Sequence, residues 1–193
     1  MATQDSRIRL KRSTISGTTP DIGPSSDHTD GTWAATDIYV SEPYLNTADN
    51  QVWVGFNSNP HCIYGNVKKT ITSAQVLTLN GTPVPFGISV PAGFYISPLR
   101  ADCYIDFNSA AYATNTNLRI RAVGATAGDF IIGANGILAA VGNTFAGLAM
   151  QNGAANSINF ITAADFEVFV PTGNPTAGDS DITIYLTYML IPV

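Results

Sequence analysis

Short runs of strand-forming residues, broken by glycine and proline, decide the fold class of this chain. Its 193 residues include 17 Gly and 11 Pro, which together with Thr, Asn and Ser separate runs rich in Ile, Val, Phe and Tyr. Short apolar runs between turn residues are typical of β-strands. Only 12% of the residues are charged, whereas about 25% is usual, so few Lys, Glu or Arg residues remain for exposed helix faces. The sequence therefore predicts an all-β fold.

Three regions follow one another along the chain. Residues 1–32 join a short basic arm to a stretch rich in Gly, Pro, Ser, Thr and Asp, which is linker composition. Residues 33–70 contain a β-hairpin module, in which Leu45 and residues 52–54 pair around the turn sequence NTADN. A hairpin is marginal alone in water, so we expect it to pack either on its own C-terminal domain or on copies of itself. Residues 71–193 form a β-domain, called the knob below.

Eight strand-like runs in the knob predict a β-sandwich of jelly-roll type. The stretch 136–150 leaves two interpretations open, a strand pair or one short helix, because Ala and Leu favour a helix whereas three glycines weaken one. The eight runs are residues 75–79, 93–97, 102–107, 117–123, 129–132, 157–161, 166–170 and 182–191.

Opposite charges predict one strand pairing within the knob. Asp102 and Asp106 share one face of their run, and Arg119 and Arg121 share one face of the next run. Antiparallel pairing of these two runs places opposite charges across from each other, which contributes about 0.2–1 kcal/mol per pair. We therefore expect these two strands to be neighbours.

The last run, ITIYLTYMLI at 182–191, has no polar face. A strand with two apolar faces is covered on both sides. We expect the opposite sheet to cover one face and a neighbouring subunit to cover the other. The candidate subunit contacts are Tyr185, Thr187, Met189 and Ile191.

Charge is distributed unevenly and points to an attachment arm. Residues 1–12 carry a net charge of +3 and residues 13–193 carry −8. The predicted attachment residues, which add a strand to a partner or contact its acidic surface, are Arg7, Arg9, Lys11 and Arg12.

The rest of the chain argues against two classes of partner. Residues 122–193 contain no Lys or Arg, which argues against a nucleic-acid-binding body. No run approaches the ~20 apolar residues of a membrane-spanning helix, and no apolar signal stretch follows the basic N-terminus.

Residues that carry chemistry are few, so we expect no catalytic residue, metal or cofactor. Two His and two Glu are present in all, and the adjacent His61 and Cys62 lack the further ligands of a zinc site. The carboxylate pairs Asp102 with Asp106 and Asp165 with Glu167 are the candidates for glycoside hydrolysis, and solvent-facing positions on strands explain them better. GDSD at 178–181 is a weak calcium candidate. Cys62 and Cys103 are expected to be buried or semi-buried thiols rather than a disulfide.

Aromatic residues gather in the hairpin module. They are Trp33, Tyr39, Tyr44, Trp53 and Tyr64. Aromatic side chains can stack on sugars, but those of a hairpin usually form its own core or a subunit contact, which is the interpretation favoured here.

Two segments carry a resemblance to a known group of proteins. LKRST at 10–14 and GTWAATDIYVSEPYLNTADNQVWVG at 31–55 resemble a module of virion proteins of tailed bacteriophages, found on head fibres and tail fibres. The family usually has Gly at the position of Ser41. The resemblance implies functional roles for Lys11 and Arg12 and, in the hairpin module, for Trp33, Asp37, Tyr39, Glu42, Asn46, Asp49 and Trp53.

The resemblance implies a non-enzymatic virion component that assembles in the host cytoplasm as a homotrimer. Its N-terminus would attach to capsid or other virion proteins and its knob would project, as in a short head fibre or capsid decoration. The alternative is a tail-fibre protein that binds a receptor or host-surface glycan. A depolymerase enzyme is a third and less favoured hypothesis. No nucleic-acid or membrane partner is expected.

Overall fold

The computed structural model describes residues 11–22, 37–38, 42–56, 59–125, 131–132, 136–150 and 161–193. These residues form one sheet of eleven strands and a second of two, β2 and β3. Helix within them is confined to α2 (Ser73–Val76) and a 3-10 turn at Ile137–Ala139. The predicted all-β fold is confirmed.

The strands, in chain order, are β1 (Lys11–Ser13), β2 (Asp21–Ile22), β3 (Asp37–Ile38), β4 (Pro43–Asn46), β5 (Gln51–Phe56), β6 (Asn59–Ile71), β7 (Val84–Pro85), β8 (Phe94–Asp106), β9 (Arg119–Ala122), β10 (Ile131–Ile132), β11 (Thr144–Met150), β12 (Phe166–Phe169) and β13 (Asp181–Pro192).

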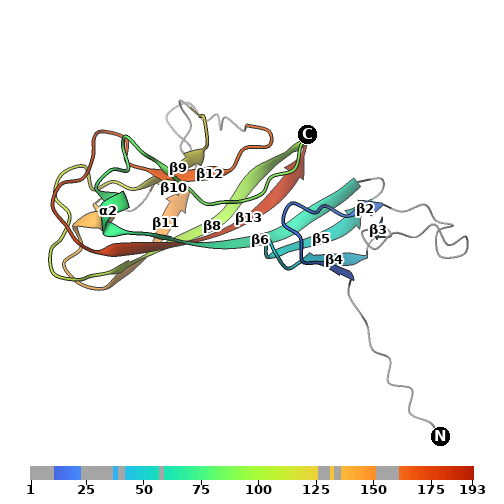
Figure 1. The fold of residues 1–193 in the computed structure, drawn as a ribbon, viewed down its shortest axis with the longest axis horizontal. Helices are drawn as coiled ribbons and strands as arrows, with labels where there is room; N and C mark the ends of the chain where they lie inside the picture. The colour runs from blue at the N-terminus through green and yellow to red at the C-terminus, as the bar shows by residue number, and fades with distance from the viewer. Residues whose placement is uncertain are drawn as a thin grey trace, which may run out of the picture.

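The large sheet folds over itself into two layers. Its order is β1-β4-β5-β6-β13-β8-β11-β10-β9-β12-β7, and every pair is antiparallel except β1 with β4. In the knob, β9 and β12 lie above the layer formed by β6, β13, β8 and β11 (Figure 1). The knob is therefore a β-sandwich. Its jelly-roll type stays a prediction.

Three long strands connect the hairpin module to the knob. β6 pairs with β5 between Asn59 and Gly65 and with β13 up to Ile71, so the sheet passes through the predicted boundary at residue 70 without a break. β8 and β13 end where the hairpin begins, and the hairpin strands continue beyond them (Figure 1).

Register shifts interrupt the pairing where the two regions meet. They fall at Val52/Trp53 between β5 and β6, at Tyr188/Leu190 between β13 and β6, and at Thr187/Tyr188 between β13 and β8. Bulges of this kind increase the local twist of a sheet. Gly65 lies at this point because a Cβ there would stand 2.5 Å from Cζ of Tyr188.

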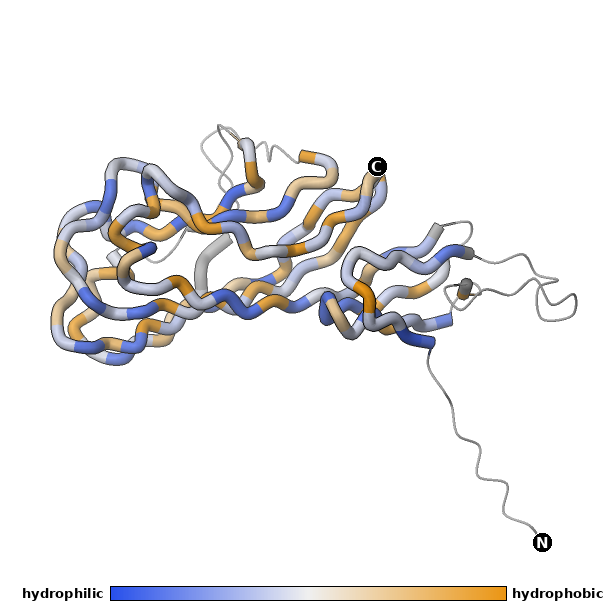
Figure 2. Tube along the Cα trace, in the orientation of Figure 1, coloured by the Kyte–Doolittle hydropathy of each residue, from blue (hydrophilic) through white to orange (hydrophobic). Residues whose placement is uncertain are grey.

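The final strand has one buried face and one partly open face. Ile182, Ile184 and Leu186 are fully buried in the core, followed by Tyr188 and Leu190 at 1% exposed. Hydropathy alternates along the long strands accordingly (Figure 2). The opposite face of β13 carries Tyr185, which is 38% exposed.

The predicted strand at 75–79 is wrong, because this segment forms α2 and the turn after it. Gln75 N donates to Thr72 Oγ1, and Thr72 N donates to Gln75 Oε1 at 3.0 Å. This reciprocal pair is a capping box, which stabilises the first turn of a helix. Its signature, Thr72 followed three residues later by Gln75, outweighs the strand preference of Val76 and Leu77.

The predicted pairing of the Asp102 and Arg119 strands is also wrong. β13 and β11 flank β8, whereas β10 and β12 flank β9. Asp102 pairs instead with Arg100 of its own strand, Nε to Oδ2 at 2.7 Å, and Arg121 pairs with Glu167 of β12 at 2.7 Å. The acidic residues of β8 and the arginines of β9 have opposite charges, but the strand order gives them other partners.

The remaining runs agree with the prediction to different degrees. Runs 93–97 and 102–107 merge into the single strand β8, and β9, β12 and β13 occupy the predicted runs near 117, 166 and 182. The stretch 136–150 combines the 3-10 turn with one strand, β11. Residues 129–130 and 157–160 lie outside the described residues.

Candidate functional site

The turn between β4 and β5 is shaped by a side chain of the resembling motif. Leu45 pairs with Val52 as predicted. Asn46 Oδ1 accepts hydrogen bonds from Ala48 N at 3.1 Å and from Asp49 N at 3.2 Å, as Asn does when it begins a turn. Asn50 closes the turn with a φ of 52°. The hairpin therefore presents Asn46 and Asp49 at fixed positions.

The edge of this hairpin binds strand β1. Lys11–Ser13 lies parallel to β4, with Lys11 opposite Tyr44 and Ser13 opposite Asn46. Thr47 donates twice to Ser13 O, from N and from Oγ1, each at 2.9 Å. Lys11 Nζ lies 3.2 Å from Glu42 Oε2.

The residues after β1 are held by the turn itself. Asn46 Nδ2 donates to the carbonyl oxygens of Ile15 at 3.3 Å and Thr18 at 3.0 Å. Asp49 accepts from Ser16 Oγ at 2.6 Å and from Gly17 N at 2.7 Å. We call the edge formed by Glu42 and residues 43–49 the strand seat. It recognises residues 11–18 mainly through their backbone.

Gly17 is required in this arrangement for two reasons. Its φ is 75°, a left-handed conformation that favours glycine. A Cβ at this position would also lie 2.9 Å from Ser89 Oγ. The segment seated on the hairpin therefore also contacts a loop of the knob.

A buried polar chain fastens the hairpin to the last strand of the knob. Trp53 Nε1 donates to Gln51 Oε1 at 3.1 Å, and Gln51 Nε2 donates to the Tyr188 hydroxyl at 3.2 Å. Trp53 also meets Phe94 of β8 edge to face, with ring centroids 5.6 Å apart. Burial raises the pKa of Tyr188, so its hydroxyl stays protonated. Trp53 is thus a core residue at the contact between the hairpin and the knob, as expected for an aromatic residue of a hairpin.

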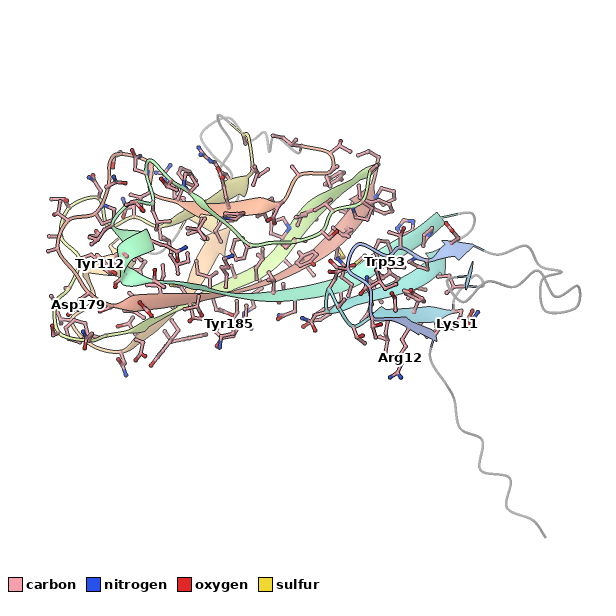
Figure 3. All side chains as sticks on the ribbon, in the orientation of Figure 1. Lys11, Arg12, Trp53, Tyr112, Asp179 and Tyr185 are labelled. Carbon is pink, nitrogen blue, oxygen red and sulfur yellow. The ribbon has the colours of Figure 1, made fainter. Side chains whose placement is uncertain are left out.

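The structure brings together Lys11, Glu42, Asn46 and Asp49, and Trp53 is buried on the next strand, paired with Tyr44. Arg12 projects from β1 into open space (Figure 3). Asp37 lies in β3, whose Ile38 is fully buried. Arg7, Arg9, Trp33 and Tyr39 lie outside the described residues.

Several residues that contribute to the strand seat contact were not predicted from the sequence. The contacts of Ser16, Gly17 and Thr47 join segments that are distant in the sequence. A local sequence pattern does not indicate such partners. Gln51 could have been found, because a polar residue that opens an apolar run beside a turn often has a buried partner.

The outward face of the hairpin carries an apolar stripe with a basic rim. Arg12, Leu45, Val52 and Tyr64 lie in register across β1, β4, β5 and β6. A shallow hollow of about 270 Å³ lies against the last three of them and the turn. Tyr64 is 43% exposed. This surface is suited to an apolar partner segment with negative charge nearby.

The outward face of the knob carries the candidate subunit contacts. Tyr185 points away from β9 and β12 (Figure 3), and Thr187, Met189 and Ile191 on the same side of β13 are half-buried. Phe145 of β11, opposite Tyr104, adds an aromatic side chain that is 61% exposed.

The carboxylates singled out from the sequence have structural partners. Glu167 binds Arg121, and Asp165 Oδ2 accepts from Gly87 N at 2.7 Å. Burial raises the pKa of Asp165. Asp179 accepts from Ser109 Oγ and from the backbone N of Ser109 and Ala110, and these bonds lower its pKa to about 2.

Both cysteines are free and buried, as predicted. Burial raises the pKa of Cys62 to about 11 and that of Cys103 to about 12, which makes both thiols unreactive near neutral pH. Across the described residues, no three His, Cys, Asp or Glu side chains are grouped so as to hold a metal ion. None of the described helices has the length and apolar character needed to cross a membrane.

Comparisons with known proteins add little. No family model matches the chain. No curated protein matches it either. Among solved structures, a chain of the Cyanophage Pam1 capsid asymmetric unit is 16% identical, with a TM-score of 0.38 over 66% of this chain and 82% of that chain. A TM-score this low carries no conclusion about fold or function.

Proposed function

We propose that this chain is a non-enzymatic structural protein of a bacteriophage virion, namely a short trimeric head fibre or capsid decoration anchored by its N-terminus. The supporting observation is the strand seat. Glu42, Asn46 and Asp49 were predicted from a sequence resemblance and Lys11 from both the resemblance and the charge pattern, and they converge on one contact between β1 and the hairpin. These four residues of the resembling segments therefore act at one contact.

The geometry at β1 supports attachment through the N-terminus. β1 lies at the end of the sheet order and at the hairpin end of the molecule, while the loops around α2 lie at the opposite end (Figure 1). Arg12 is exposed there, and Arg7 and Arg9 precede it in the sequence. Basic residues beside the apolar stripe suit an acidic and apolar surface of a capsid protein or another virion protein.

The outward face of the knob supports a homotrimer. The face of β13 that carries Tyr185 remains partly open in the single chain, and Phe145 adds a second exposed aromatic side chain on β11, with β8 between them. Exposed large apolar side chains on one face are a feature of protein contacts. The proposed location is the virion, after assembly in the host cytoplasm, with no nucleic-acid or membrane partner.

Removal of residues 1–10 tests the attachment, because it spares β1 and the seat. In an infection that supplies the variant in place of the intact chain, we expect the truncated protein to be absent from purified particles. It should remain a folded trimer by light scattering. Val141→Ser is the matched control, because Val141 is 81% exposed and belongs to the knob. Normal incorporation of the truncated chain would refute anchoring through residues 1–10, and a monomer would refute the trimer.

Binding of a host glycan is the second candidate function. Phe145 and Tyr185 are exposed near the polar side chains of Asp102 and Lys68, a combination that can stack on and hydrogen-bond to sugars. A glycan array probed with the full chain and with Phe145→Ala tests it. Residues 71–193 alone are unsuitable, because that fragment lacks β6, which pairs with β13.

A further inference from the structure

The strand seat makes the same contacts with any copy of residues 11–18. Those contacts are the pairing of β1 with β4, the ion pair of Lys11 with Glu42, and the bonds from the turn at Asn46 and Asp49. All of them are non-covalent, and each ends on an atom of residues 11–18. A neighbouring copy therefore presents an equivalent ligand.

The connection between β1 and β4 favours exchange between copies. The two strands are parallel, so no tight turn can join them and a long crossover must. Between β2 and β3 this crossover comprises residues 23–36, with the linker sequence GPSSDHTDGT near its start. Fourteen residues reach as far as about 50 Å. Because β2 lies between β1 and this stretch, residues 11–22 move together, and the length allows them to reach an adjacent hairpin.

We propose that in the assembled oligomer residues 11–22 of one subunit cross to a neighbouring subunit, where residues 11–18 occupy the strand seat and β2 pairs with β3. This inference rests on the proposed homotrimer, whose partly open face on β13 brings other copies close. Each exchanged strand also reaches a knob loop of its host, because Gly17 packs against Ser89. Exchange around a threefold axis closes a ring and leaves no strand or seat unfilled. The subunits are then interlocked at the attachment end.

A disulfide placed across the seat distinguishes exchange from closure within one chain. Arg12 and Leu45 are register partners, and adjacent strands hold such residues at the Cα separation that a disulfide needs. In the full chain carrying Arg12→Cys and Leu45→Cys, oxidation should give mainly covalent trimer on a non-reducing denaturing gel. Cys62 and Cys103 can remain, because both are buried.

The matched control is the full chain with Leu45→Cys and Val52→Cys, which are register partners within one hairpin. It should give monomer on the same gel, whatever the oligomeric state. Light scattering before denaturation reports that state separately. A native trimer whose Arg12–Leu45 pair yields only monomer overturns the exchange and leaves the proposed function standing. A native monomer overturns both. The exchange is likewise overturned when the Leu45–Val52 control pair forms its disulfide but the Arg12–Leu45 pair does not.

Discussion

The hairpin module and the knob bury their apolar side chains in different ways. The knob encloses aliphatic residues between two layers, with Ile120 of β9 and Ile184 of β13 both fully buried. Among the described residues, no second layer of the large sheet lies over the module, and β2 of the small sheet contacts β6 instead. Tyr44 and Trp53 are its largest buried side chains, and the polar residues Asn46 and Gln51 are buried beside them at 1% and 3% exposed.

This difference shows that the module depends on the knob. Gln51 is satisfied by Tyr188 and Trp53 packs on Phe94, so both contacts end on β13 and β8. β6 is shared by the two regions. The module is therefore better described as an extension of the knob's sheet than as an independent domain.

Trp53→Ala should have the largest effect and should separate the two regions. It removes the Phe94 contact and leaves Gln51 without its donor, at a cost of about 3–5 kcal/mol in the free energy of unfolding. In hydrogen exchange, amides of β4 and β5 should lose protection while those of β9 and β12 keep theirs. Val141→Ala, at an exposed position, should change neither. Equal loss of protection in both regions would mean that they unfold as one unit.

Gly65→Ala should have a smaller effect, concentrated where the regions meet. Its Cβ would stand 2.5 Å from the Tyr188 ring, and that ring cannot withdraw freely because it is buried and accepts a bond from Gln51. We expect a loss of about 1–3 kcal/mol, which is the usual cost of overpacking, measured by urea unfolding. Gly81→Ala is the control, because nothing lies within 4 Å of the added Cβ. Equal midpoint urea concentrations for Gly65→Ala and Gly81→Ala would contradict the tight fit of Tyr188 on Gly65.

Local patterns in the sequence were sufficient for the hairpin and for β13. Alternation on either side of the NTADN turn determined the pairing of Leu45 with Val52, and the apolar run at 182–191 determined the last strand. The strand order was not predictable in this way. β13 inserts between β6 and β8, and no charge pattern in the sequence indicates which strands become neighbours.

The candidate site was predictable only where side chains act through the resembling motif. Glu42, Asn46 and Asp49 were found from it. The bonds of Asp49 to Ser16 and Gly17 depend on how a separate segment turns back onto the hairpin. The partner of Gln51 lies 137 residues away in the sequence, so only the folded sheet reveals it.

The smallest effect concerns the loops, where the two regions resemble each other. Asp49 at the hairpin end and Asp179 in the knob each hold a distant segment by accepting several hydrogen bonds. The Ser109 hydroxyl, with the N–H groups of Ala110 and Ser109, lowers the pKa of Asp179 from 3.8 to about 2 in the folded state. The ionised carboxylate therefore favours folding above pH 4, and that contribution disappears as the pH falls toward 2.

Asp179→Asn removes this titration. At pH 7 the variant should melt at a lower temperature than the intact protein, because the neutral amide cannot accept the same set of bonds. The difference should shrink between pH 4 and pH 2, as the intact protein loses its ionised carboxylate and the variant has none to lose. Thermal unfolding followed by circular dichroism at several pH values measures this, with Ser109→Ala expected to lie between the two. A difference that stays constant from pH 7 to pH 2 would show that the loop is held by shape rather than by the charge of Asp179.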